Sequence, residues 1–187
     1  AASGEARFDH DPVTGESKGL LIEEARTNLV ANSVVSVANW YVPSATTLLE
    51  DFSVAPDGTL TATGFAGNGA NAQHYVLTNV NFSANTYTTS VYLKAGAVTT
   101  VYMELGSAYQ SVDLTDGSIS ATGNFGVNWT YSSGNSEYVG NGWYRISTQT
   151  NTTGIDRVHI YPSDSDTNNS SSGSIYIQSA QLESGLV

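Results

Sequence analysis

Apolar and polar residues alternate with a period of two along most of the chain from about residue 72 onward. Successive side chains of a β-strand point to opposite faces, so this alternation predicts half-buried strands. The clearest run, TYTTSVYLKAG at 86–96, places Val91 and Leu93 on one face and Tyr92 and Lys94 on the other. Further runs occupy 72–82, 99–106, 109–123, 142–150, 156–162 and 173–183.

These runs are short and are ended by Gly, Asn, Asp or Ser, which favour turns. The run at 109–123 is interrupted by Thr115-Asp116-Gly117 and predicts two strands around a turn. Residues 30–71 alternate less regularly but contain other strand-like runs. Many short strands at regular spacing predict an all-β fold, an antiparallel β-sandwich.

The opening segment ARFDHDPVTGESKGLLIEEARTNL, residues 6–29, shows no such alternation. It concentrates ionisable groups, contains the turn-forming residues Pro12 and Gly15, and has one apolar cluster from Leu20 to Ile22. We expect an extended N-terminal arm or linker at 1–33, followed by the β-sandwich at 34–187. The first residues lack the pattern of a signal peptide and are typical of the middle of a longer chain.

Composition narrows the function. The chain of 187 residues carries 17 acidic and 6 basic residues, a net charge of −11. So few cations cannot form the basic patch that nucleic acid or an anionic membrane requires. There is no cysteine, which excludes disulfides and thiolate metal sites. No apolar run approaches the ~18 residues of a membrane-spanning helix.

Catalytic chemistry has little support. His10, His74 and His159 sit in unrelated segments, and no Gly-x-Ser-x-Gly elbow is present. We therefore predict a non-enzymatic protein without a cofactor.

A metal site has a weak signal. Asp164, Asp166 and Asn168 have the spacing of a calcium loop's first ligands, but Asn169 replaces its glycine and Ile175 its final carboxylate. A solvated acidic loop explains the segment better, although oxygen ligands are plentiful enough for a structural calcium.

Sugar binding is the more interesting interpretation. If Val101, Met103 and Leu105 point inward, the outward strand positions combine tyrosines with polar partners, a pattern typical of carbohydrate recognition. These positions are Tyr92, Lys94, Tyr102, Glu104, His159, Tyr161, Tyr176 and Gln178. The same face would also suit burial against another chain or the arm, because tyrosine is enriched at protein interfaces. Both interpretations remain open.

The three tryptophans differ in their surroundings. Trp143 starts a strand and Trp40 follows a loop, so we expect both to be buried. Trp129 lies among polar residues near Tyr131 and is the best candidate for an exposed, sugar-stacking ring.

The opening segment, with Ser33 and Trp40 after it, resembles a segment common in virion proteins of tailed phages and prophages, described as tail-fibre or structural. The landmarks YTTSVYLKAG, VDLTDGSIS, GNGWYRIS and SIYIQSAQLESG resemble the lectin-like domain of those proteins. That domain is similar to the jelly-roll carbohydrate-binding modules of polysaccharide hydrolases. The resemblance transfers no individual binding residue.

The resemblance implies a jelly-roll domain of a tail fibre, spike or head fibre on the exterior of a bacteriophage particle. Its function would be non-catalytic binding to a polysaccharide on the bacterial surface, with other virion proteins as neighbours. The arm would pack between the subunits of a homotrimer; the alternative assembly is a monomer whose arm folds back over its own sandwich. The alternative is a purely structural virion part, such as a capsid decoration or a fibre-assembly domain. A carbohydrate-binding module of a polysaccharide-degrading enzyme ranks third.

Overall fold

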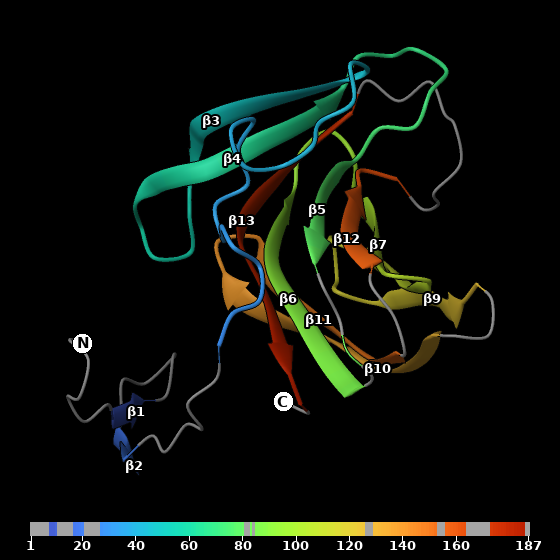
Figure 1. Cartoon of the computed structure of the whole chain (residues 1–187). Helices are drawn as coiled ribbons and strands as arrows, with labels where there is room; N and C mark the ends of the chain where they lie inside the picture. Colours follow the sequence, from blue (N-terminus) through green and yellow to red (C-terminus); the bar gives the residue numbers. More distant parts are fainter. Residues whose placement is uncertain are drawn as a thin grey trace.

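The computed structural model describes residues 8–10, 17–20, 27–80, 83, 85–125, 129–152, 156–163 and 173–185. The chain is an antiparallel β-sandwich, as the alternation predicted, and no helix occurs in these ranges (Figure 1). Accordingly, this part of the chain offers no helix that could cross a membrane.

Two sheets form the sandwich. The six-stranded sheet has the order β10 (Trp129–Gly140), β11 (Trp143–Thr152), β6 (Asn85–Ala95), β13 (Ser174–Ser184), β4 (Leu60–Gly67) and β3 (Thr46–Val54). The five-stranded sheet has the order β5 (Val76–Val80), β12 (Asp156–Tyr161), β7 (Thr100–Leu105), β8 (Ala108–Asp113) and β9 (Ile119–Asn124). The chain passes from one sheet to the other after β4, β5, β6, β9, β11 and β12.

A separate pair of short strands lies in the predicted arm, where β1 (Phe8–His10) pairs with β2 (Ser17–Leu20). Residues 27–33, at the other end of that predicted arm, contact the sandwich. The Leu29 amide donates to the Leu182 carbonyl at 2.7 Å, and the Ala180 amide donates to the Ser33 carbonyl at 2.9 Å. The last part of the predicted arm therefore lies along β13. The boundary at residue 33 stays a prediction.

The core fills the space between the two sheets. Val91 and Leu93 of β6 are buried there, as the alternation predicted. The predicted inward positions of β7, Val101, Met103 and Leu105, are buried as well. Each such side chain contributes about 1.5–3 kcal/mol when it leaves water. Trp40 is also buried, as expected, and its indole nitrogen donates to the Asn32 carbonyl at 3.1 Å.

Each sheet contains one hairpin with an Asp-Gly turn. In the β3–β4 turn, Gly58 has a φ of 85° and Asp57 Oδ1 accepts from the Thr59 amide at 2.9 Å. In the β8–β9 turn, Gly117 has a φ of 78°, and Asp116 Oδ1 accepts from the Ser118 amide at 2.8 Å. Positive φ is costly for residues with a Cβ, which is why glycine follows the aspartate in both turns.

Candidate functional site

The outward strand positions predicted from the sequence fall on two different surfaces, the outer faces of the two sheets. Tyr92 of β6 pairs with Gln178 of β13, and Lys94 pairs with Tyr176, so these four belong to the six-stranded sheet. Glu104 and Tyr102 of β7 pair with His159 and Tyr161 of β12 in the five-stranded sheet. The two sets therefore cannot form one binding surface.

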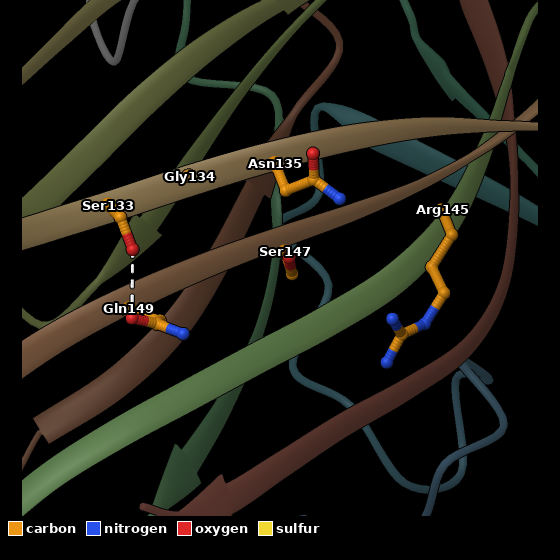
Figure 2. A pocket seen from close by; sticks show the side chains of 6 residues that line it. All are labelled: Ser133, Gly134, Asn135, Arg145, Ser147 and Gln149. Atoms are coloured by element: carbon orange, nitrogen blue, oxygen red, sulfur yellow. Dashed lines mark hydrogen bonds between the residues drawn. The ribbon is translucent and has the colours of Figure 1, made fainter. Parts of the chain in front are cut away.

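The outer face of the six-stranded sheet carries two adjoining hollows. The first has a volume of about 250 Å³ and is lined by Ser133, Gly134, Asn135, Arg145, Ser147 and Gln149 (Figure 2). The second has a volume of about 330 Å³ and is lined by Pro56, Asp57, Tyr92, Val139, Gln178 and Ser179. Arg145 and Tyr92 are cross-strand partners, so the hollows adjoin at that pair. We call the two together the groove.

Small side chains create the first hollow. β10 is an edge strand rich in serine, glycine and asparagine, and Ser147 follows on β11. The Arg145 side chain extends across β6 (Figure 2). Its Nη2 donates to the Ser90 hydroxyl at 3.4 Å. The Ser133 hydroxyl donates to Gln149 Oε1 at 2.8 Å. The groove thus offers amide, hydroxyl and guanidinium groups from neighbouring strands.

Two charged side chains define the electrostatics of the groove. Arg145 is the charged residue among the six that line the first hollow. In the second hollow, the hydroxyl and the amide of Thr59 donate to Asp57 and hold the pKa of its carboxyl below the ordinary value of 3.8. Asp57 is therefore ionised at neutral pH, because hydrogen bonds to the carboxylate favour its charged form.

An aromatic cluster borders the groove on the same outer face. Trp143 is fully buried there against Ala55 and Ala62, with Tyr92 and Tyr176 packed beside them. Its indole nitrogen donates to the Val54 carbonyl at 3.1 Å. The expected burial of Trp143 is confirmed, but the ring lies under the β3–β4 hairpin and not between the sheets.

The outer face of the five-stranded sheet is closed by its own rings. Tyr102 stacks on Tyr109 with 5.2 Å between ring centroids, and Tyr109 stacks on Phe125 at 4.9 Å. Tyr75 lies edge-on to His159 at 5.1 Å and tilted against Tyr161 at 5.4 Å. These contacts link rings from several strands and from the segment before β5.

Of the two interpretations left open for these residues, an exposed sugar-binding surface does not hold on this face, because the chain's own rings bury it. Tyr102 and Tyr161 are each 4% exposed, and Glu104 and His159 are each 7% exposed. The alternation correctly separated the inward residues of β7 from Tyr102 and Glu104. It could not reveal the neighbouring rings, such as Tyr75, that pack against this face.

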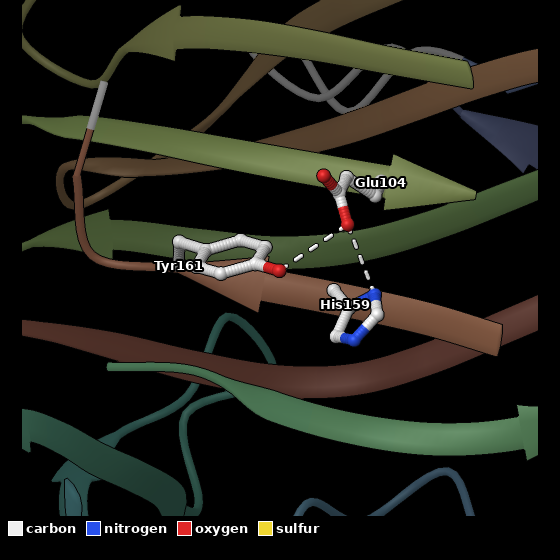
Figure 3. Close-up of polar contacts among 3 residues, drawn as sticks. All are labelled: Glu104, His159 and Tyr161. Carbon is white, nitrogen blue, oxygen red and sulfur yellow. Dashed lines mark hydrogen bonds and ion pairs between the residues drawn. The ribbon is translucent and has the colours of Figure 1, made fainter. Parts of the chain in front are cut away.

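A buried polar contact lies beneath those rings (Figure 3). Glu104 Oε2 lies 3.0 Å from His159 Nδ1 and accepts a hydrogen bond of 3.2 Å from the Tyr161 hydroxyl. The distance between Glu104 and His159 is that of an ion pair, although the alignment at Nδ1 falls short of a good hydrogen bond. The hydrogen bond and the close approach of Glu104 to His159 tie β7 to β12, while His159 Nδ1 itself has no hydrogen-bond partner in the described part of the chain.

Trp129, the best candidate for an exposed ring, is instead buried, with 4% of its surface exposed. It packs over Gly106, whose φ is 62°, and a Cβ built there would lie 2.3 Å from the ring. The residues that surround Trp129 in the sequence are polar, so nothing near it indicated this contact with the distant Gly106. Tyr131 is half-buried, and burial raises the pKa of its hydroxyl.

The candidate calcium ligands Asp164, Asp166 and Asn168 lie outside the described residues. Within the described ranges, no three His, Cys, Asp or Glu side chains are grouped so that they could hold a metal ion.

Sequence reasoning found Tyr92 and Gln178 but missed Asn135, Arg145 and Gln149 of the groove. β10 is exposed along most of its length and mixes serine, glycine and asparagine, so it carries no alternating signal. The run GWYRIS offered a clue, because alternation places Arg145 outward between Tyr144 and Ile146.

Comparisons with known proteins show little beyond the fold. No family model matches the chain, and no curated protein matches it. Five chains of solved structures match. One comprises the CBM22-1 and GH10 modules of the N-terminal endo-1,4-β-D-xylanase 10B of Clostridium thermocellum, complexed with xylohexaose. The TM-score is 0.44 and the identity 14%, over 84% of this chain and 28% of that one. At this level of likeness, no ligand or activity transfers to this chain.

Proposed function

We propose that this chain is a non-catalytic glycan-binding domain that holds a saccharide in the groove of the six-stranded sheet. The observation that carries the proposal is the arrangement of Asn135, Gln149 and Gln178 beside Arg145 and Tyr92 along one open surface. Amides donate and accept hydrogen bonds at once, which matches the mixed donor and acceptor character of sugar hydroxyls. The tyrosine adds an apolar surface with a polar tip.

The two outer faces of the sandwich differ in whether their aromatic rings have an uncovered face. A ring can stack on a sugar only if one of its faces is uncovered. Tyr109 is flanked by Tyr102 on one side and Phe125 on the other. Tyr92, by contrast, is only partly buried and lines the second hollow. The groove is therefore the better site for a saccharide.

In this proposal the domain acts on the exterior of a phage particle, as part of a tail fibre, spike or head fibre. The resemblance of the opening segment to phage virion proteins supports that location and the homotrimer. An open groove with few contacts would bind each chain of a bacterial polysaccharide weakly, and several copies would raise the overall affinity by avidity. Light scattering that finds a monomer would contradict the trimer. A carbohydrate-binding module of a polysaccharide-degrading enzyme would use the same groove.

One observation favours the structural alternative. Leu49, Phe52, Val54 and Leu60 of β3 and β4 are between 48% and 59% exposed, and β3 is the outermost strand of its sheet. Exposed apolar side chains at a sheet edge favour contact with another chain. A capsid-decoration or fibre-assembly domain would bury them against a neighbour.

The proposed function is tested by a bacterial glycan array with the purified chain. Asn135→Ala removes an exposed groove amide that has no hydrogen bond in the described part of the chain, so affinity should fall by about five- to tenfold without loss of stability. Asn79→Ala also removes an exposed asparagine amide, from β5 in the other sheet, and is the matched control. Absence of binding across the array, or equal effects of both variants, would contradict a glycan site in this groove.

A further inference from the structure

We infer that the saccharide held by the groove is acidic, and that Arg145 recognises the carboxylate of a uronic acid. This inference rests on the proposed function and specifies the chemical class of its ligand.

Arg145 has hydrogen-bonding capacity to spare. A guanidinium carries five N–H donors, and Arg145 uses one in its 3.4 Å contact with the Ser90 hydroxyl. Glu137 faces it as the cross-strand partner on β10, but no carboxylate of the described residues lies within ion-pair distance of Arg145. A half-buried cation without an anionic partner is unfavourable for folding, and a bound anion would satisfy it.

The distribution of cations strengthens this point. Lys94, Arg145 and Arg157 are the basic residues whose side chains the structure describes. Arg145 and Lys94 both lie on the outer face that carries the groove. Arg145 is the cross-strand partner of Tyr92, and Lys94 follows Tyr92 by two residues on β6. Lys94 already lies over the Trp143 ring, 6.0 Å from its centroid. Arg145 is thus left to meet a ligand in the first hollow.

The surroundings of Arg145 suit a carboxylate that is carried by a sugar. The planar guanidinium fork matches a carboxylate through two parallel hydrogen bonds. Ser90 and Ser147 are small and leave space beside the fork. Asn135 and Gln149 line the same hollow and can bond to ring hydroxyls. A neutral sugar would cover the guanidinium without pairing its charge, and the site would therefore discriminate against it.

The net charge of −11 does not prevent this recognition. At physiological ionic strength, screening limits charge interactions to roughly 8 Å, so a ligand in the first hollow responds mainly to nearby groups. Asp57 lines the other hollow and already accepts two hydrogen bonds from Thr59. Glu137 lies at the exposed edge strand.

The test uses uronic-acid-containing bacterial polysaccharides, each paired with its carboxyl-reduced form, which keeps the backbone and lacks the charge. Affinities are measured by titration calorimetry with the whole chain. Where an acidic polysaccharide binds, we expect its affinity to be about ten- to hundredfold higher than that of its carboxyl-reduced form. Arg145→Gln should abolish this preference, and Arg145→Lys should lose most of it, because lysine keeps the charge without the fork.

Arg157→Gln is the matched control, since it removes one positive charge from β12 in the other sheet. It should leave the preference intact. An unchanged melting temperature of the Arg145→Gln variant would show that the substitution changes ligand binding without disturbing the fold. Equal binding of acidic and reduced forms, with both weakened by Asn135→Ala, would overturn the inference and leave the proposed function standing. Dextran sulfate binding as tightly as the acidic polymers would overturn it too, because general attraction to polyanions would then suffice. Binding to no glycan at all would contradict the proposed function itself.

Discussion

The two outer faces of the sandwich start from similar residues and end as different surfaces. On the five-stranded sheet, tyrosines from β7, β8 and β12 pack on one another and bury Glu104 with His159. On the six-stranded sheet, tyrosines gather beside Trp143 at the border, and serines, asparagine and glutamines leave hollows next to them. Aromatic content alone does not identify a binding surface. What decides is whether ring faces are covered by other rings.

Tyr102→Ala should produce the largest effect, and the comparison predicts an effect on stability alone. The substitution removes a buried ring that contacts Tyr109 and Tyr161. Loss of a buried aromatic side chain should lower the free energy of unfolding by about 3–5 kcal/mol, measured by urea denaturation. Glycan affinity of the folded variant should be unchanged. A stable variant with lost affinity would instead place the binding site on this face.

Glu104→Gln should have an intermediate effect. Glutamine keeps an oxygen that accepts from the Tyr161 hydroxyl but removes the charge beside His159. We expect the free energy of unfolding to fall by about 1–3 kcal/mol, because a buried polar group loses its charged partner. The double variant with His159→Gln would separate the pair from its surroundings. Additive losses in that double-mutant cycle would show that the two side chains do not interact.

The smallest effects concern the two Asp-Gly turns, one in each sheet. For Asp57 the Thr59 hydroxyl is the largest cause of the lowered pKa, whereas for Asp116 it is the Ser118 amide. Carboxyl titration by NMR should therefore show a larger rise in the aspartate pKa for Thr59→Val than for Ser118→Ala. Equal rises would contradict this assignment.

The pH dependence of stability follows from the same turns. Both aspartate pKa values are lower in the folded chain than the ordinary 3.8. Their stabilising contribution is therefore fully present above the unfolded-state pKa and is lost as pH falls through the folded-state pKa. Thr59→Val should reduce the fall in the free energy of unfolding at acid pH. Urea denaturation at a series of pH values would detect this change.

Alternation along the sequence was sufficient for most strands of the two sheets, but it missed β10 and did not reveal the site. It separated Val91 and Leu93 from Tyr92, because the period of a strand depends on local geometry alone. Burial of the outward residues depends on segments far away in the sequence. Tyr75 over His159 and Trp129 over Gly106 are contacts of that kind. No local pattern encodes them.

The groove was largely hidden for a related reason. Its first hollow depends on β10, an edge strand with one exposed and one half-covered surface. Such a strand needs no regular apolar positions, so its serines and glycines are indistinguishable from loop residues in the sequence. Tyr92 and Gln178 were found because their strands lie further inside the sheet and alternate clearly.

The hydrogen bond from Trp143 to the Val54 carbonyl has a consequence for the cost of binding. It fastens the β3–β4 hairpin to β11, so Pro56 and Asp57 are held in place before any ligand arrives. A flexible loop at this position would lose conformational entropy on binding, and that loss would weaken the complex. In the proposed complex the hairpin is already fixed, so most of the ordering cost would fall on the saccharide.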